Sequence, residues 1–245
     1  MSAPHVAEAM PLPEPAAPRP VRMMCVPYAG AGAGVYRGWR QAPGAVLDVI
    51  PVQLPGREEE FTVPFHRTVR EAAEDVAGRV VRDAGGTPFV IFGHSLGAVL
   101  AYEATRYLWE TGGPLPRHLV VSGSVSPRRR RPQRLSADPE QAVAQLGELT
   151  GQVEAFADPE LRDLLLPALR ADIAMLDGYH PQPRRPLPIA LTAIRGADDA
   201  TVPVADWQDW TAYTSAAFRT VELPGGHMYL TESWPTVLRT VEELA

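Results

Sequence analysis

The sequence predicts an α/β fold, with a mostly parallel β-sheet and helices on both of its faces. Short apolar runs alternate with helix-forming segments, which is the pattern of parallel strands joined by helical crossovers. Residues 67–84 place Val69, Ala73, Val76 and Val80 at helical spacing, so one face of this segment is apolar. The length of 245 residues and the hydrophobic content of 45% suit one domain with a substantial core.

Each expected strand is a short apolar run next to turn residues. These runs are 21–27, 45–54, 88–92, 118–123, 188–194 and 218–223. The expected helices cover 67–84, 97–110 and 234–244.

Residues 127–186 interrupt this alternation. They contain no convincing strand, and two segments open with Asp-Pro, at 138–139 and 158–159, which is a helix-start signal. We therefore predict a helical insertion over 127–186. Pro167 is expected to kink or split its second helix.

The composition restricts the partners and the compartment. A formal net charge of -6 argues against a general nucleic-acid binder, and the single cysteine, Cys25, fits a reducing compartment. No apolar run approaches the roughly 20 residues that cross a bilayer. Residues 1–20 are rich in proline and lack the basic start and apolar core of a signal peptide. We expect a disordered leader over 1–20, a folded domain over 21–245, and a cytoplasmic monomer that binds neither nucleic acid nor membrane.

The segment GHSLG, residues 93–97, follows an expected strand and opens an expected helix. A turn this sharp presents a serine nucleophile in a strained backbone conformation. It brings the residues two before and two after so close that only small ones fit. Gly93 and Gly97 occupy those two positions, so we predict that Ser95 is the nucleophile. The alternative is an ordinary tight turn with a capping serine.

A serine nucleophile needs a base, and the base needs an orienting acid, in the chain order Ser, acid, His for this architecture. His227 lies in a glycine-flanked loop after the last expected strand, where a base can reach the serine. His94, next to the serine, is expected to point away from it. Asp198 and Asp199 both follow the strand at 188–194. We favour Asp199, because Val202-Pro203 can anchor the chain beyond it.

Acyl transfer also needs two backbone N–H donors for the oxyanion. We expect these donors to be Leu96, which follows the nucleophile, and Ala29, in the loop after the first strand. The run Gly-x-Gly-x-Gly within 29–34 could instead suggest a phosphate cradle, but it lacks the Lys-Ser/Thr ending of one and is a weak signal alone. We expect no metal and no other cofactor.

Together these features resemble the type II thioesterases of polyketide and nonribosomal peptide assembly lines, which are α/β-hydrolases. The resemblance covers nearly all of 21–244. It is carried by PYAG (27–30), QLPGRE (53–58), FGHSLGA (92–98), LLPALRAD (165–172), GADD (196–199) and GGHMYL (225–230).

The resemblance implies a catalytic triad of Ser95, Asp199 and His227. It also implies hydrolysis of acyl thioesters on the phosphopantetheine arm of acyl or peptidyl carrier proteins, which removes stalled or aberrant acyl units. In this family the helical insertion acts as a lid over the acyl pocket.

Several alternatives stay open at this point. The four arginines Arg128, Arg129, Arg130 and Arg131 can steer an acidic carrier protein to the lid, or can form a solvated loop. An apolar stripe in the insertion can belong to the core or line an acyl tunnel; it consists of Leu161, Leu164, Leu165, Leu169, Ile173 and Leu176. The competing functions are a general carboxylesterase or lipase with the same triad, and a non-catalytic binding module.

Overall fold

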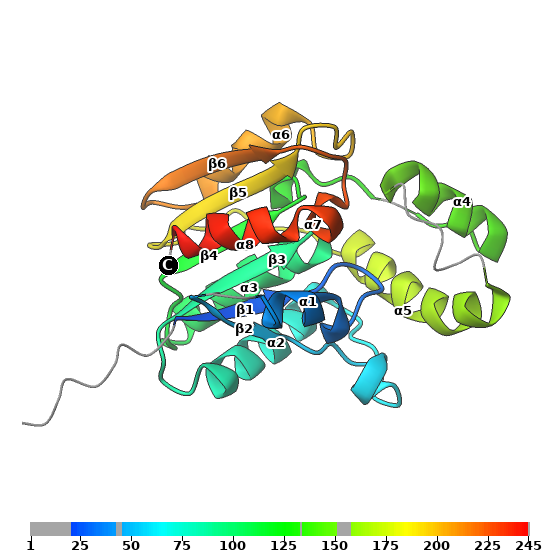
Figure 1. Cartoon of the computed structure of the whole chain (residues 1–245), viewed down its shortest axis with the longest axis horizontal. Coiled ribbons are helices and arrows are strands. Elements are labelled where there is room, and N and C mark those ends of the chain that lie inside the picture. The colour runs from blue at the N-terminus through cyan, green and yellow to red at the C-terminus, as the bar shows by residue number, and fades with distance from the viewer. Residues whose placement is uncertain (1–20, 43–45, 133, 151–157, 245) are drawn as a thin grey trace, which may run out of the picture.

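The computed structural model describes residues 21–42, 46–132, 134–150 and 158–244, and the predicted leader at 1–20 lies outside these residues. Its sheet is entirely parallel and has the strand order β2-β1-β3-β4-β5-β6 (Figure 1). The strands are β1 (Arg22–Val26), β2 (Asp48–Pro51), β3 (Phe89–His94), β4 (His118–Ser122), β5 (Ala190–Gly196) and β6 (Phe218–Leu223).

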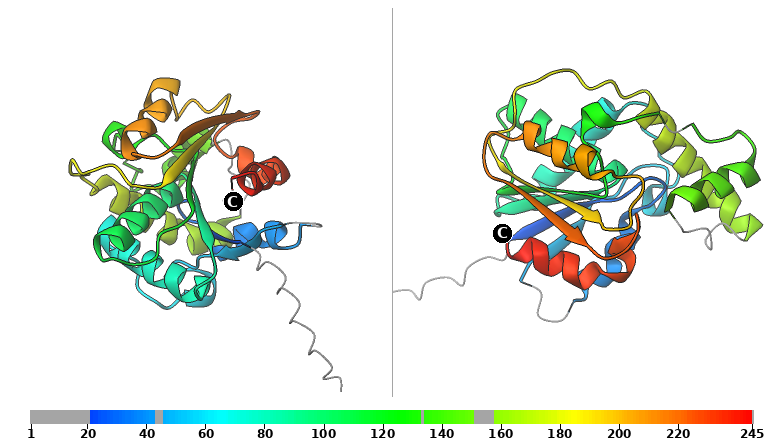
Figure 2. Two further views of the ribbon diagram at one scale, coloured as in Figure 1. Left: turned by 90° about the vertical axis from the view of Figure 1, so that its left-hand side faces the viewer. Right: turned by 90° about the horizontal axis from the view of Figure 1, so that it is seen from above.

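Helices cover both faces of the sheet. The α-helices are α1 (Arg37–Arg40), α2 (Val69–Ala84), α3 (Leu96–Glu110), α4 (Pro139–Thr150), α5 (Pro159–Asp177), α6 (Val204–Gln208), α7 (Tyr229–Glu232) and α8 (Trp234–Glu242). The 3-10 segments are η1 (Ala33–Tyr36), η2 (Glu58–Glu60), η3 (Pro127–Arg129) and η5 (Asp209–Tyr213). Helices α2 and α3 lie against one face of the sheet, and α1 and α8 lie against the other (Figure 2).

The predicted α/β fold is confirmed, and all six expected strands are present. The strand expected over 45–54 is shorter than predicted: β2 covers only Asp48–Pro51, although the Val52 N–H still donates to the Cys25 oxygen of β1 at 2.8 Å. Helices α1, α6 and α7 were not predicted, since four or five residues are too few to give a periodic pattern.

Helix α2 shows how local signals and packing agree. The Thr68 hydroxyl accepts a hydrogen bond from the Glu71 N–H at 3.1 Å, and Gly85 ends the helix with a left-handed φ of 52°. The apolar positions predicted from helical spacing, including Val76 and Val80, are fully buried. The amphipathic pattern therefore faces the core as expected.

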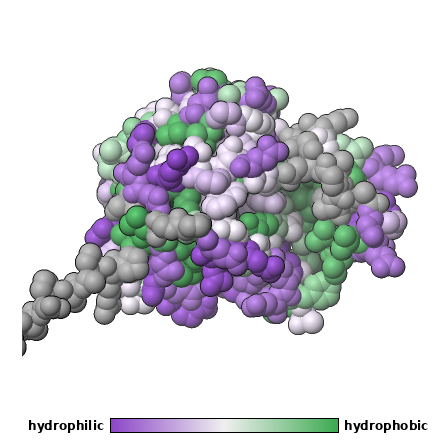
Figure 3. All heavy atoms as spheres, in the orientation of Figure 1, coloured by the Kyte–Doolittle hydropathy of each residue, from purple (hydrophilic) through white to green (hydrophobic). Residues whose placement is uncertain are grey.

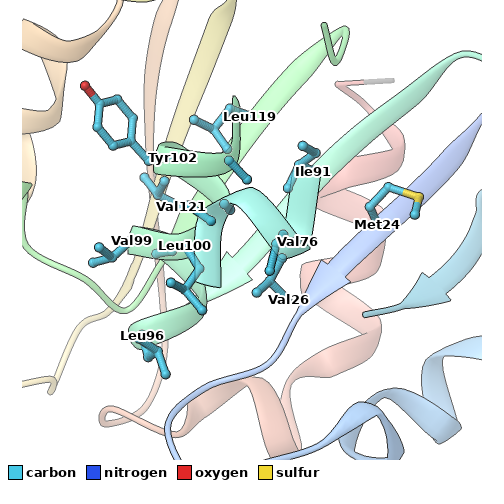
Figure 4. Packing of buried hydrophobic residues seen from close by; sticks show 14 of the residues in the cluster. Met24, Val26, Val76, Ile91, Leu96, Val99, Leu100, Tyr102, Leu119 and Val121 are labelled. Atoms are coloured by element: carbon cyan, nitrogen blue, oxygen red, sulfur yellow. The ribbon is translucent and has the colours of Figure 1, made fainter. Parts of the chain in front are cut away.

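The main core lies between the sheet and helices α2 and α3. Figure 4 shows side chains of α3, among them Leu96, Val99 and Leu100, packed with Ile91 of β3 and Val121 of β4. Burying an aliphatic side chain of this size contributes roughly 1.5–3 kcal/mol, so this face of α3 holds the turn before it in place.

The insertion is helical where it is described. Helices α4 and α5 begin at the two Asp-Pro signals and project beyond one end of the sheet (Figures 1 and 2). Pro167 lies inside α5 and does not split it, so that part of the expectation is wrong. Pro167 has no N–H, so the Asp163 carbonyl has no hydrogen-bond donor within the helix. Both residues are exposed, so water can solvate this carbonyl. None of the helices formed by the described residues is long and apolar enough to cross a bilayer.

The turn between β3 and α3 is closed by backbone contacts. A Cβ atom on Gly93 would lie 2.0 Å from the Gly97 carbonyl oxygen, and one on Gly97 would lie 2.2 Å from the Val26 oxygen of β1. Ser95 between them has φ 54° and ψ -114°, a conformation that non-glycine residues rarely adopt. The two glycines are thus required by space, as the sequence predicts.

We expect Gly93→Ala to destabilise the protein by about 2–5 kcal/mol, because the new methyl group meets backbone that cannot move aside. Gly78→Ala is the matched control. Gly78 lies on the exposed side of α2 with nothing within 4 Å of a new Cβ, so this change should stabilise by up to about 1 kcal/mol. Chemical denaturation of both variants measures the difference. Equal stability of the two variants would contradict the steric argument.

Candidate active site

The three residues of the predicted triad follow three different strands of the sheet. Ser95 follows β3, Asp199 follows β5, and His227 follows β6. Because carboxyl ends of parallel strands meet at one edge of a sheet, the three side chains lie at the same end of this sheet. Ser95 and His227 line the same cavity, which has a volume of about 420 Å³.

The loops after β5 and β6 touch each other through their backbones. A Cβ atom on Gly196 would lie 2.4 Å from the Gly225 oxygen, which also accepts a hydrogen bond from the Asp198 N–H at 3.0 Å. This contact explains why Gly196 precedes the acid and holds the loop of Asp199 against the loop of His227.

His227 is oriented by a buried carboxylate. Its Nδ1 lies 2.8 Å from Asp199 Oδ2 and 3.0 Å from the Thr201 hydroxyl. Since the facing carboxylate can only accept, Nδ1 carries the proton and Nε2 is left free to accept one. The side chain of His227 can therefore act as a general base.

Thr201 fixes the acid in turn. Its backbone N–H and its hydroxyl both donate to Asp199 Oδ1, at 2.9 and 2.6 Å. Burial alone would raise the pKa of the Asp199 carboxyl, but the hydrogen bonds from His227 and Thr201 hold that pKa below its usual value. Asp199 is therefore ionised at neutral pH. Thr201 was not predicted, because its role depends on a contact between two loops.

The structure separates the two candidate acids. Asp199 is 4% exposed and contacts His227, whereas Asp198 lies exposed on the same loop. The other histidines described lie elsewhere or have other partners. His118 Nε2 lies 2.8 Å from the Thr192 hydroxyl, and His66 Nε2 lies 3.1 Å from Asp75.

His94 lies beneath the base. Its ring centroid is 5.1 Å from that of His227, and its Nδ1 lies 2.8 Å from the Ser122 hydroxyl, which also contacts the Tyr229 hydroxyl at 2.5 Å. Burial, reinforced by the neighbouring His227, holds the pKa of His94 well below its usual value. His94 is thus a neutral support for the His227 ring, a contact that the sequence did not predict.

The two predicted oxyanion donors belong to the two segments next to Ser95, the start of α3 and the loop after β1. Leu96 is the first residue of α3, so its N–H has no partner within the helix, and the positive end of the helix dipole lies here. Ala29, in the loop after β1, lines the cavity together with Ser95. The hydrogen bonds of the His227 side chain within the described residues are those to Thr201 and Asp199, and none joins it to the Ser95 side chain.

The apolar stripe of the insertion divides into two parts. Leu169, Ile173 and Leu176 of α5 line the cavity that holds Ser95. Leu161 and Leu164, in the first turns of α5, are 48% and 50% exposed. Figure 3 shows apolar surface at the end of the molecule where α5 projects. Only the second half of the stripe therefore belongs to the cavity wall.

The four arginines at 128–131 fall into two pairs that differ in their ionic contacts. Arg128 Nε lies 2.7 Å from Asp209, and Arg129 Nε lies 3.4 Å from Asp209 and 3.6 Å from Asp206. Arg129, Arg130 and Arg131 all line the Ser95 cavity. Neither Arg130 nor Arg131 forms an ion pair with another described residue, and burial lowers the pKa of Arg130, an effect that Tyr179 and Asp177 oppose. The first two arginines are thus neutralised within the fold.

Comparisons with known proteins identify the family. The model of the Thioesterase domain family matches residues 21–244. Linear gramicidin dehydrogenase LgrE of Brevibacillus parabrevis is 34% identical over 232 residues, which cover 88% of this chain and 84% of LgrE. The name of LgrE describes a dehydrogenase, whereas the matched family is one of thioesterases.

Two solved structures are similar to this chain in both fold and sequence. The RedJ thioesterase from the prodiginine pathway of Streptomyces coelicolor has a TM-score of 0.85 and 34% identity, covering 98% of this chain and 97% of RedJ. The type II thioesterase BorB from the borrelidin biosynthetic cluster has a TM-score of 0.80 and 31% identity, covering 94% of this chain and 95% of BorB. The chain therefore belongs to the thioesterase family of α/β-hydrolase fold and is a thioester hydrolase.

Proposed function

We propose that this enzyme hydrolyses acyl thioesters on the phosphopantetheine arm of carrier proteins, removing stalled or aberrant acyl units from a polyketide or nonribosomal peptide assembly line. One observation carries the proposal: Ser95 and His227 line a cavity that has an apolar wall on α5 and arginines in its lining. The biosynthetic pathways named for RedJ and BorB support the choice of substrate.

In the first half of the reaction, Ser95 Oγ attacks the carbonyl carbon of the thioester and its proton passes to His227 Nε2. The carbonyl electron pair moves onto the oxygen, where the Ala29 and Leu96 N–H groups stabilise the charge. The carbonyl then re-forms, the C–S bond breaks, and the leaving thiolate takes the proton from His227. Asp199 stabilises the positive charge that His227 holds between these two transfers.

In the second half, water replaces the thiol. His227 takes a proton from the water, whose oxygen attacks the acyl-serine carbonyl carbon, and the same two N–H groups stabilise the second oxyanion. The bond between the acyl carbon and Ser95 Oγ then breaks, and Ser95 Oγ takes the proton back from His227. The products are a carboxylic acid and the free enzyme.

The cavity suits an acyl group attached to a longer polar arm. Leu169, Ile173 and Leu176 offer apolar contacts for the acyl chain, whereas Arg130 and Arg131 lie where the arm and its carrier protein would approach. Carrier proteins are usually acidic, so the cations that line this cavity favour their encounter. One chain supplies every candidate residue, and we propose that the protein acts as a monomer. The free thiol of Cys25 fits the reducing cytoplasm, which we propose as its compartment.

The substrate class is tested by measuring hydrolysis of two substrates that carry the same acyl group, one a thioester on a carrier protein and the other a simple oxygen ester. We expect kcat/KM to be at least about tenfold higher for the carrier thioester, a difference of ~1.4 kcal/mol in transition-state stabilisation. Equal or faster turnover of the oxygen ester would favour a general carboxylesterase. Failure of a fluorophosphonate probe to label Ser95 would favour a binding module instead.

The triad assignment is tested by four substitutions with retained thermal stability as the control. Ser95→Ala and His227→Ala should each lower kcat by about 10⁴- to 10⁶-fold, because triad members act as a unit. Asp199→Asn should lower kcat by about 10⁴-fold, because it loses the charge that orients His227. Asp198→Asn, on the same loop but exposed, should change kcat less than about twofold. The reverse order for the two aspartates would make Asp198 the acid.

The docking assignment is tested by two matched double variants. Arg130→Ser with Arg131→Ser should lower kcat/KM on an acyl-carrier protein by about three- to tenfold and flatten its dependence on salt. Hydrolysis of a small acyl thioester, which brings no protein surface, should fall much less. Arg128→Ser with Arg129→Ser should mainly lower stability, because both arginines pair with Asp209 and only Arg129 also lines the cavity. Equal losses on both substrates, or no loss on either, would refute docking at Arg130 and Arg131.

A further inference from the structure

Two sequence motifs that lie far apart in the chain meet in a buried ion pair. Arg57 of PGRE is 7% exposed and Asp172 of LRAD is 4% exposed. Arg57 donates from both terminal nitrogens to Asp172, at 2.6 Å to Oδ2 and 2.9 Å to Oδ1. This fork geometry is the strongest pairing that an arginine and a carboxylate form.

Stability alone does not account for this pair. Removing two charges from water is costly, and well-packed apolar residues of similar size are often at least as stabilising. The remaining contacts of the pair point to a different role. Arg57 also donates to the Ala31 oxygen at 3.2 Å, and Asp172 Oδ2 accepts the Gly30 N–H at 2.8 Å.

The pair therefore holds the loop after β1 at two peptide groups, the one between Ala29 and Gly30 and the one that follows Ala31. The Gly30 N–H belongs to the peptide that directly follows the Ala29 N–H, so only the two backbone torsions of Ala29 separate the held group from the donor. The Ala31 N–H donates to the Tyr28 oxygen at 3.1 Å and closes the turn on its other side. Gly30 itself has a φ of 78°, which favours glycine at this position.

The same helix that supplies Asp172 also packs on this loop. Leu169, three residues earlier on α5, lies 3.1 Å from the position of a Cβ atom on Gly30. Leu169 and Ile173 line the cavity that holds Ser95. Helix α5 thus contributes to the wall of the acyl cavity and fixes the loop that carries Ala29.

We propose that Arg57 and Asp172 are positioning residues that orient the Ala29 N–H toward the oxyanion and fix α5 against the catalytic loop. The proposal rests on the assignment of Ala29 as an oxyanion donor in the proposed function. Neither side chain touches the reacting atoms, so both act through the backbone of residues 29–31.

The test is a double variant, Arg57→Met with Asp172→Leu, which removes both charges together and leaves none unpaired. We expect its thermal stability to stay near that of the parent and its kcat for a small acyl thioester to fall about 10- to 100-fold, with KM within about threefold. Arg106→Met is the matched control. Arg106 is another buried arginine, held by Glu110 and the Arg185 oxygen near the far end of α3, and its loss should leave kcat unchanged.

A boronic acid inhibitor separates positioning from general damage. Ser95 Oγ bonds to boron and its proton passes to His227, which leaves a tetrahedral anion with an oxygen at the oxyanion position. In the double variant, affinity for the boronate should fall by the same factor as kcat, while affinity for an unreactive thioether analogue of the substrate should hold. Equal weakening of both ligands, or a kcat within about twofold of the parent, would overturn the proposal.

Arg57→Lys keeps the proposal testable if the double variant does not fold. A lysine retains a cation beside Asp172 but has no fork to reach both the carboxylate and the Ala31 oxygen. The kcat of this variant should fall less than that of the double variant, again with KM nearly unchanged. A kcat equal to that of the parent would also overturn the proposal. These comparisons use a small thioester, so their outcome does not depend on whether carrier proteins are the natural substrates.

Discussion

The site depends on a close approach of three backbone segments: the end of β1, the end of β3 and the first turn of α3. Side chains at Gly93 or Gly97 would overlap the Gly97 and Val26 carbonyl oxygens, so the turn can close only without them. The Ser95 N–H donates to the Ser122 oxygen of β4 at 2.8 Å and holds the strained residue from the other side. Strain at one residue is thus maintained by packing that involves three neighbouring strands.

A second close backbone contact at a glycine occurs where Asp199 and His227 follow their strands. Gly196 lies against the carbonyl oxygens of Gly225 and Gly226, so the loops after β5 and β6 are held backbone to backbone. A parallel sheet brings all these strand ends to one edge, but it does not by itself fix loops to within hydrogen-bonding distance. The glycines do so, and the short distances among Asp199, Thr201 and His227 follow from them.

Features set by a few consecutive residues could be predicted from the sequence, and features set by contacts between distant segments could not. The turn at Ser95, the helical spacing of α2 and the Asp-Pro starts of α4 and α5 are local, and the structure has the elements where the sequence predicts them. Thr201 and the support of His227 by His94 depend on how separate loops meet. The division of the arginine run is likewise non-local, because Arg128 and Arg129 pair with carboxylates that follow β5. The continuity of α5 through Pro167 could not be predicted, because the exposure of Pro167 and Asp163, which lets water solvate the unpaired carbonyl, is a property of the tertiary structure.

The two halves of α5 differ in their contacts with the Ser95 cavity and with the loop of Ala29. Its second half carries Leu169, Ile173 and Asp172, which contact the cavity or the loop of Ala29. Its first half carries the exposed Leu161 and Leu164, which take no part in either. Substitutions in the first half can therefore alter the surface of the insertion without moving the loop of Ala29. A change of size at Leu169 acts on the cavity wall and on Gly30 at once. Under the proposed function, acyl preference and catalytic rate are therefore physically linked at that residue.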